Sequence, residues 1–185
     1  MKNIDSYISE KLKINKDIIE NTKKIQVKSK IELLDIIHKR LAESKDLDLT
    51  DIDISGLDDG DLIYLFENEK ARSIDMIGWD LSKQTDIHGM FWMNDSIEEV
   101  YCDDWDTSNV KSMYGVFKGC YNLKKLDVSN WDVSDVIEFT YMFENCISLP
   151  SDFNVDKWKP KRGVNVINMF ANDKQLKQPS WWRKI

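Results

Sequence analysis

The apolar residues of this chain recur at a fixed distance. Four tryptophans are each followed twelve positions later by a phenylalanine: Trp79 and Phe91, Trp105 and Phe117, Trp131 and Phe143, and Trp158 and Phe170. Successive tryptophans in this set are 26, 26 and 27 residues apart. A fixed period of this size is typical of a stacked repeat array, in which each unit contacts mainly its neighbours.

Within each unit, the apolar spacing predicts a short helix followed by a strand. Apolar residues stand eight, eleven and twelve positions after the tryptophan, as Met113, Val116 and Phe117 do, and spacings of three and four lie on one helical face. A serine three positions after the tryptophan is a favourable helix N-cap (Ser82, Ser108 and Ser134). Before each tryptophan, apolar and polar residues alternate as in a half-buried strand. These apolar residues are Ile74 and Met76, Val100 and Cys102, Leu126 and Val128, and Phe153 and Val155. We therefore expect an α/β fold, a leucine-rich-repeat-like solenoid of short helix-plus-strand units.

The two ends of the chain depart from the repeat. Residues 4–12 have the spacing of a short amphipathic helix, and Ser29 followed by Glu32 forms a capping box for a helix that runs to about Glu43. We expect an N-terminal helical leader and cap over 1–46, a solenoid of about five units over 47–176, and a C-terminal cap over 177–185. The adjacent Trp181 and Trp182 either seal the last unit, dock to a partner or lie at a membrane surface.

The distribution of charge along the chain limits the kinds of partner that it can bind. The net charge is −7, but residues 51–160 carry 9 basic and 23 acidic side chains, whereas residues 161–185 carry 6 and 1. An acidic array repels nucleic-acid backbones, so we expect no nucleic-acid partner. No apolar run is long enough to span a membrane, and the first residues lack a secretory signal. We expect a cytoplasmic or virion-associated protein.

Candidate chemistry is sparse. Cys120 and Cys146 occupy the same repeat position, which predicts inward-facing free thiols, as does the odd count of three cysteines. The two histidines, His38 and His88, stand in no catalytic motif, so we expect no enzyme. An aspartate follows three of the repeat tryptophans (Asp80, Asp106 and Asp132). Calcium needs more oxygen ligands than one aspartate per unit, so we interpret this column as bonding turn amides and expect no metal and no cofactor.

The motif Trp105-Asp106-Thr107-Ser108-Asn109-Val110, with Met113, the segment Val116 to Cys120, and Leu123 to Trp131, resembles the BspA-like leucine-rich repeat of bacterial surface proteins and mycoplasma lipoproteins. The resemblance covers about residues 50–176 and implies helix-plus-strand units with roles in adhesion or protein binding, without enzymatic activity. The leader from Ile4 to Asp17 is similar to one on several proteins of crAss-like gut bacteriophages, which implies a phage-encoded member.

The outward-facing strand positions are the best functional candidates. If the apolar strand positions point inward, the residues between them stack into one polar face that can bind a partner protein. Its candidate residues are Asp75, Glu99, Tyr101, Asp103, Lys125, Asp127 and Asn154. The leading hypothesis is a non-enzymatic protein–protein interaction module that uses this acidic face. The alternatives are a virion-associated structural or cargo protein addressed by its leader, and a phage inhibitor of a host defence protein.

Overall fold

A computed structural model describes residues 24–184, so the predicted helix over 4–12 and the phage-like leader lie outside the described residues. The elements are β1 (Ile25–Gln26), α2 (Lys30–Glu43), β2 (Asp46–Asp48), β3 (Ile52–Asp53), β4 (Ser73–Asp75), β5 (Glu99–Tyr101), β6 (Lys125–Leu126) and the 3-10 turn η1 (Trp182–Lys184). Strands β2, β4, β5 and β6 form a parallel sheet in that order, and β1 pairs with β3. The expectation of a mixed α/β fold is confirmed.

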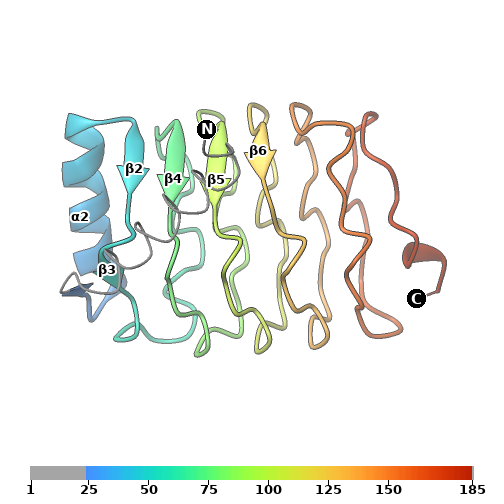
Figure 1. Ribbon diagram of the computed structural model, residues 1–185, viewed down its shortest axis with the longest axis horizontal. Helices are drawn as coiled ribbons and strands as arrows, with labels where there is room; N and C mark the ends of the chain where they lie inside the picture. Colours follow the sequence, from blue (N-terminus) through green and yellow to red (C-terminus); the bar gives the residue numbers. More distant parts are fainter. Residues whose placement is uncertain (1–23, 185) are drawn as a thin grey trace, which may run out of the picture.

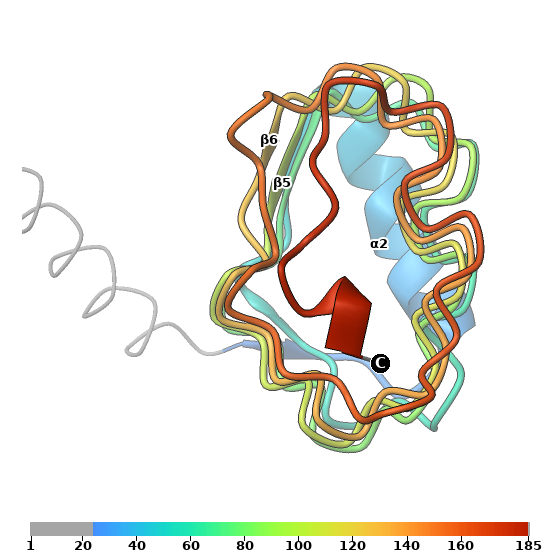
Figure 2. The same ribbon diagram turned by 90° about the vertical axis from the view of Figure 1, so that its right-hand side faces the viewer.

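The chain winds in coils that lie side by side (Figure 1). On one side of each coil, which we call the strand side, Ser73 pairs with Glu99 and Glu99 with Lys125, a step of 26 residues each time. On the other side, which we call the turn side, parallel bridges link successive coils through Asp86, Ser112, Glu138 and Asn165. Viewed end-on, the coils superimpose into one elongated ring (Figure 2).

The short helix predicted in each unit is wrong: the turn side consists of successive tight turns. Two positions in each coil, ten and fourteen residues after the tryptophan position, have a left-handed backbone. The first series is Tyr64, Gly89, Gly115, Tyr141 and Asn168, and the second is Asn68, Met93, Gly119, Asn145 and Asn172. Left-handed residues interrupt a right-handed helix, so the helical spacing of the apolar residues does not produce one.

Alternate backbone N–H groups of the turn side donate to the neighbouring coil, and those between them close the turns within a coil. The backbone N–H groups of Gly115, Phe117 and Gly119 donate to Thr140, Met142 and Glu144 of the next coil at 2.9, 2.9 and 2.8 Å. An α-helix would need these donors for carbonyls four residues earlier in the same segment. The predicted N-cap role of Ser82, Ser108 and Ser134 is therefore also wrong. Their N–H groups instead donate to Asp80, Asp106 and Asp132 at 2.9, 3.0 and 2.9 Å.

Stacked aromatic rings fill the core, and the inward direction predicted for the apolar positions is confirmed. Successive rings in the series Phe66, Phe91, Phe117, Phe143 and Phe170 stack at 5.1, 5.1, 5.7 and 5.4 Å between centroids, with interplanar angles of 12° or less. Beside them, Trp79, Trp105 and Trp131 stack at 6.4 and 5.6 Å. Each such pair adds roughly 0.5–1.5 kcal/mol to the free energy gained by burial.

The indoles also bind each coil to the one before it. The Nε1–H of Trp105 donates to the carbonyl of Met76 at 3.2 Å, and that carbonyl also accepts the N–H of Trp79 at 3.2 Å. Equivalent indole bonds to the preceding coil are made by Trp79, Trp131, Trp158 and Trp181. A buried indole N–H needs an acceptor, and the repeat supplies one at each tryptophan.

Small polar side chains stand three residues after the stacked phenylalanines in the sequence, and they form a column along the stack of coils. Asn94 Nδ2 donates to the Phe66 carbonyl at 3.0 Å, and the thiols of Cys120 and Cys146 donate to Phe91 and Phe117 at 3.1 Å each. All three cysteines are free and buried, which confirms the prediction of inward thiols. Asp173 continues this column, only 4% exposed, and neither of its carboxyl oxygens has a hydrogen-bond partner among the described residues.

Different structures close the two ends of the stack. Helix α2 covers the first coil (Figure 1) and begins as the capping box predicts, with Ser29 accepting the N–H of Glu32. At the other end, Trp181 is 7% exposed and Trp182 packs against Phe170 at 5.8 Å. Of the three interpretations of this tryptophan pair, the packing supports sealing of the last unit.

We predict that Phe117→Ala lowers the free energy of unfolding by about 3–5 kcal/mol, because it removes a ring that stacks on both neighbouring coils. The matched control is Ile137→Ala, whose side chain is 62% exposed and which should change stability by less than about 0.5 kcal/mol. Urea unfolding followed by circular dichroism measures both free energies. Equal losses would contradict a stabilising role for the stacked phenylalanine rings, which we call the phenylalanine ladder.

Asp173 makes stability depend on pH. Burial raises its pKa to about 7, and the charge of Glu144 adds to the rise. Between its ordinary pKa near 3.8 and about 7, the folded chain keeps a proton that the unfolded chain releases. The free energy of unfolding should therefore fall as pH rises through this window.

Asp173→Asn removes the titration and supplies the side chain that already donates in this column at Asn94. We predict that at neutral pH this variant is more stable than the natural chain by roughly 2–4 kcal/mol, and that the gain shrinks toward pH 4. Urea unfolding at a series of pH values tests this. A pH profile identical to that of the natural chain would show that the carboxyl is not responsible.

Candidate functional site: the strand face

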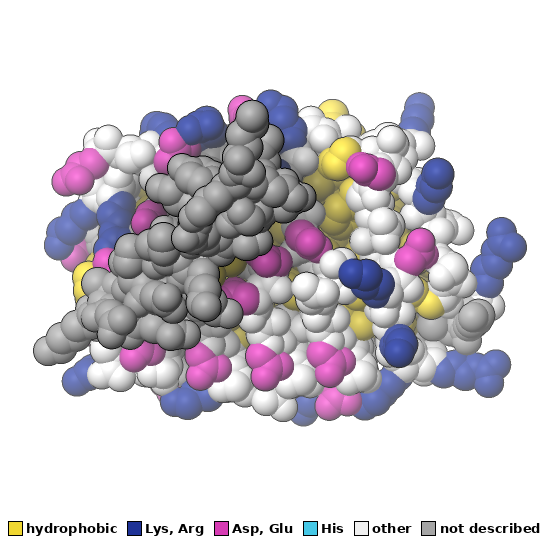
Figure 3. Space-filling model, in the orientation of Figure 1, with side chains coloured by type: hydrophobic (Ala, Val, Ile, Leu, Met, Phe, Trp, Pro, Cys, Tyr) yellow, Lys and Arg dark blue, Asp and Glu magenta, His cyan; other side chains and the backbone are white. Residues whose placement is uncertain are grey.

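The parallel register brings the predicted face residues into rows. Asp48 of β2 pairs with Asp75 of β4, and Asp75 pairs with Tyr101 of β5. The row before it contains Ser73, Glu99 and Lys125. Figure 3 shows acidic side chains spread over this face and in a line along its edge. Neighbouring strands are about 4.8 Å apart, so the charges of one row lie close together.

Asp75 is a half-buried charge of the face. Burial raises its pKa, and the carboxylates of Asp48, Asp104 and Asp103 raise it further, while the N–H of Ile77 opposes them from 3.1 Å. Like charges held opposite each other in a sheet are destabilising. This part of the face is therefore a concentrated negative site.

Tyr101 stands in the middle of the face and connects two charged residues. Its hydroxyl donates to Glu99, and Lys125 Nζ donates to the same hydroxyl at 3.1 Å while lying 4.4 Å from the ring centroid. The hydrogen bond with Tyr101 is the main cause of the raised pKa of Lys125. The predicted site residues Glu99, Tyr101 and Lys125 thus form one connected cluster.

Asp127 and Asn154 line a shallow groove where the regular sheet ends. Its walls include Leu126, Phe153 and Lys157. Pro150 stands just before the strand position of this coil and has no N–H to donate. Within residues 127–184, no strand follows β6. The pKa of Asp127 is lowered by hydrogen bonds from Ser129, whose N–H is 2.9 Å away, and by the charge of Lys157.

Asp103 is exposed, and two further acidic residues belong beside it although the sequence analysis missed them. Asp48 lies in the row of Asp75, and Asp104 accepts the N–H of Gly78 from the preceding coil at 2.8 Å. Asp48 was missed because the coil that contains it has no tryptophan on which to align. Asp104 was missed because only alternate strand positions were counted as facing outward.

The column formed by Asp80, Asp106 and Asp132 bonds turn amides, as the sequence analysis predicted. Within residues 24–184, no group of three or more His, Cys, Asp or Glu side chains is arranged to hold a metal ion. In the same range, no helix has the length and apolar character required to cross a membrane.

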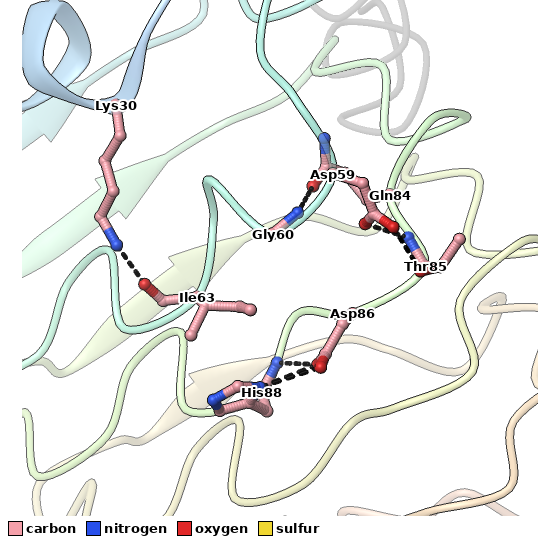
Figure 4. Close-up of polar contacts among 8 residues, drawn as sticks. All are labelled: Lys30, Asp59, Gly60, Ile63, Gln84, Thr85, Asp86 and His88. Atoms are coloured by element: carbon pink, nitrogen blue, oxygen red, sulfur yellow. Dashed lines mark hydrogen bonds and ion pairs between the residues drawn. The ribbon is translucent and has the colours of Figure 1, made fainter.

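The two histidines lie away from the strand face. His38 of α2 is 2.9 Å from Glu69, and His88, on the turn side, is 3.0 Å from Asp86 (Figure 4). Around His88, hydrogen bonds link adjacent coils: the N–H of Thr85 donates to Asp59 at 2.8 Å, and the N–H of Gly60 donates to Gln84 at 3.2 Å.

The turn side carries an aromatic surface that was also missed. Trp92 stacks on Tyr114 at 5.9 Å, and Lys118 Nζ lies 4.7 Å from the Trp92 ring and 4.0 Å from that of Tyr141. Glu144 balances the charge of Lys118 at 2.7 Å. The chain therefore satisfies this aromatic surface with its own cation, and these residues stand at different repeat positions, which hid them from the alignment.

The sequence matches the family described as "Mycoplasma protein of unknown function, DUF285" over residues 60–182. The chain belongs to the DUF285 family. This match covers the turn side, the aromatic ladders and all but one of the coils on the strand side, and it agrees with the mycoplasma-type repeat that the sequence resembles. It gives no support to a phage origin. No curated protein and no solved structure matches the DUF285 chain.

We predict that Tyr101→Phe lowers the pKa of Lys125, because the substitution removes the hydroxyl that accepts from Nζ and keeps the ring. An NMR titration of the Lys125 side chain measures the shift. Tyr121→Phe, a half-buried tyrosine outside the cluster, should leave the Lys125 titration unchanged. No shift in Tyr101→Phe would show that the hydroxyl contact does not hold the lysine.

Proposed function

We propose that the DUF285 chain is a solenoid that serves as a non-enzymatic protein-binding module, and that its strand face receives a basic segment of a partner protein. The observation that supports this most directly is the parallel register, which holds Asp48, Asp75 and Tyr101 in adjacent places of one row. Rigid repeat arrays commonly bind partners on such extended faces.

Electrostatics supports a cationic partner. Asp75 has its pKa raised by burial and by the carboxylates around it, so its negative charge is incompletely balanced within the face. A lysine or arginine side chain placed there gains attraction from several carboxylates at once. Tyr101 and the groove beside Asp127 add an aromatic ring and apolar walls next to the charges.

The test compares two variants that have the same change in net charge. In the face variant, Asp103→Lys is combined with Asp127→Asn, which keeps an acceptor for the Ser129 N–H. In the control variant, Glu67→Lys is combined with Glu43→Gln, at exposed positions on the turn side and at the end of α2. The probe is a lysine-rich peptide of about ten residues, and binding is measured by calorimetry at several salt concentrations.

We predict that the face variant binds the peptide about tenfold more weakly, and that the control variant binds nearly as well as the natural chain. Affinity should fall as salt rises, because the contacts are exposed ion pairs. Equal weakening of both variants would mean that overall charge, and not the strand face, attracts the peptide. Thermal unfolding of each variant verifies that the fold is retained.

A further inference from the structure

The backbone pairing of the strand side is broken at one place inside the array. Strands β2, β4, β5 and β6 pair in succession. Among residues 24–184, however, no backbone hydrogen bond joins β6 to the segment 150–155, which follows it one coil later. On the turn side the same two coils stay paired, because Phe139 and Tyr141 donate to Asn165 and Ile167 at 2.7 and 3.0 Å. The break is therefore local, with a coil on each side of it.

A proline accounts for the break. In three successive coils, the residue just before the strand donates its N–H to the preceding coil. The donors are Arg72, Glu98 and Lys124, at 2.7, 2.7 and 2.8 Å from the carbonyls of Lys45, Arg72 and Glu98. In the next coil this position is held by Pro150, which has no N–H. The carbonyl of Lys124 therefore lacks the donor that the repeat supplies elsewhere.

Strand β6 thus has an unpaired edge. In a parallel ladder, the backbone groups of alternate residues point to the same neighbouring strand, as the N–H of Met76 does when it donates to Tyr101 of the next coil at 3.1 Å. The equivalent N–H of Val128, the N–H and carbonyl of Leu126, and the carbonyl of Lys124 have no such partner among the described residues. We call these groups the β6 edge. None of its residues has a left-handed backbone, so an extended chain can match it.

A groove runs along the β6 edge. It has a volume of about 340 Å³ and is lined on one side by residues 126–129 and on the other by Pro150 and Phe153. Sites for ligands span roughly 300–1,000 Å³. Leu126 is only partly buried here, whereas Val100, at the same position of β5, is 2% exposed. Figure 3 shows apolar side chains at the surface of this part of the strand side. The groove therefore offers an apolar floor beside unpaired backbone groups.

The rim of the groove carries two carboxylates and one ammonium group. Asp127, Asp152 and Lys157 are all exposed there. The charge of Lys157 lowers the pKa of Asp127, so these two charges offset each other in part. Asp152 forms no ion pair within residues 24–184. The rim therefore favours a cationic side chain over an anionic one.

We propose that the β6 edge and its groove are a docking site for an extended segment of the partner protein, in which apolar and basic side chains alternate. The backbone of the segment pairs with the β6 edge as an added strand. One apolar side chain lies on Leu126 and Phe153, and a basic side chain faces Asp152. Backbone pairing supplies affinity in this mode of recognition, and the side chains supply selectivity. The cationic character of the segment rests on the function proposed for the strand face, whereas the backbone site does not.

Amide hydrogen exchange measured by NMR tests the β6 edge on the full chain. In the free protein, the amides of Leu126 and Val128 should exchange faster than that of Met76, which is bonded between coils. The probe is a peptide of alternating valine and lysine, about eight residues long, which is enough to span the edge. On its addition, the amides of Leu126 and Val128 should become protected and their resonances should shift.

Two N-methylated forms of this peptide separate backbone pairing from the attraction of charges. The N–H groups of the valines are methylated in one form and those of the lysines in the other, so both forms keep the same side chains and charge. Because alternate N–H groups of an extended chain point to the same side, only one form loses its bonds to the β6 edge. That form should bind about tenfold more weakly than the other.

Charge reversal tests the contact at the rim. Asp152→Lys should weaken binding of the valine-lysine peptide about fivefold, because repulsion replaces an exposed ion pair. The control, Glu43→Lys, makes the same charge change at an exposed position at the end of α2 and should leave binding nearly unchanged.

Several outcomes would overturn the docking site. Amides of Leu126 and Val128 that are protected in the free chain would show that the chain covers the edge itself, and protection that rises with protein concentration would assign the edge to a second copy. Equal affinities of the two methylated peptides would show that backbone pairing is not used. Equal weakening by the two charge variants would show that Asp152 is not contacted.

The same experiments separate this site from the function proposed for the strand face. Peptide-induced shifts confined to β4 and β5 would overturn docking at the β6 edge and leave the proposed function standing. Protection at the β6 edge by the valine-lysine peptide, without the weaker binding expected of the Asp103→Lys and Asp127→Asn variant, would support the edge and count against the acidic face.

Discussion

The structure depends on backbone pairing between segments about 26 residues apart in the chain. A coil of this kind cannot satisfy its own backbone, because the N–H groups of its turn side point along the stack. Phe117 N–H, for example, has its acceptor at Met142 in the next coil. Buried backbone groups must be paired, so a coil is stable only between neighbours, and the register of one coil fixes that of the next. The aromatic ladders follow from this register, because they place like rings one coil apart.

The same pairing explains why the two ends are unlike. Carbonyls remain at the start of the stack and N–H groups at its end. An α-helix can cover the start, because a lysine such as Lys30 can donate to a leftover carbonyl while the apolar side of the helix, with Leu33 and Ile37, covers the first coil. At the end, Trp182 packs against Phe170, and Trp181 packs against Phe139 and Trp182, but their rings supply no acceptor to the turn side. The core is thus closed after the last coil, whereas four N–H groups on the turn side of that coil have no acceptor among residues 24–184.

The sequence was sufficient to predict the period, the inward positions and the helical cap. It was also sufficient to predict the thiol column at Cys120 and Cys146, because these properties depend on residue type at a fixed repeat position. The turn side could not be predicted in the same way. Its apolar residues have helical spacing, and left-handed positions are held by Tyr64, Tyr141 and Met93 as well as by glycine. The glycines and asparagines at the equivalent positions were the available signal. At Gly115, for instance, an added Cβ would lie 2.4 Å from the Trp92 ring.

The alternation of apolar and polar residues was enough to predict the candidate strand face. The electrostatics of that face could be derived only from the register of the paired strands. Sequence spacing placed Asp75 and Tyr101 in equivalent positions, yet only the paired strands show that Asp48 stands directly beside Asp75. When the same repeat position carries a charged residue in successive coils, parallel pairing of the strands holds these charged side chains close to one another. Like charges so held oppose the stack that carries them. Here Lys125 offsets the negative charge at one end of the face, whereas Asp75 remains among carboxylates. In the function that we propose, a basic segment bound across the strands would relieve that repulsion.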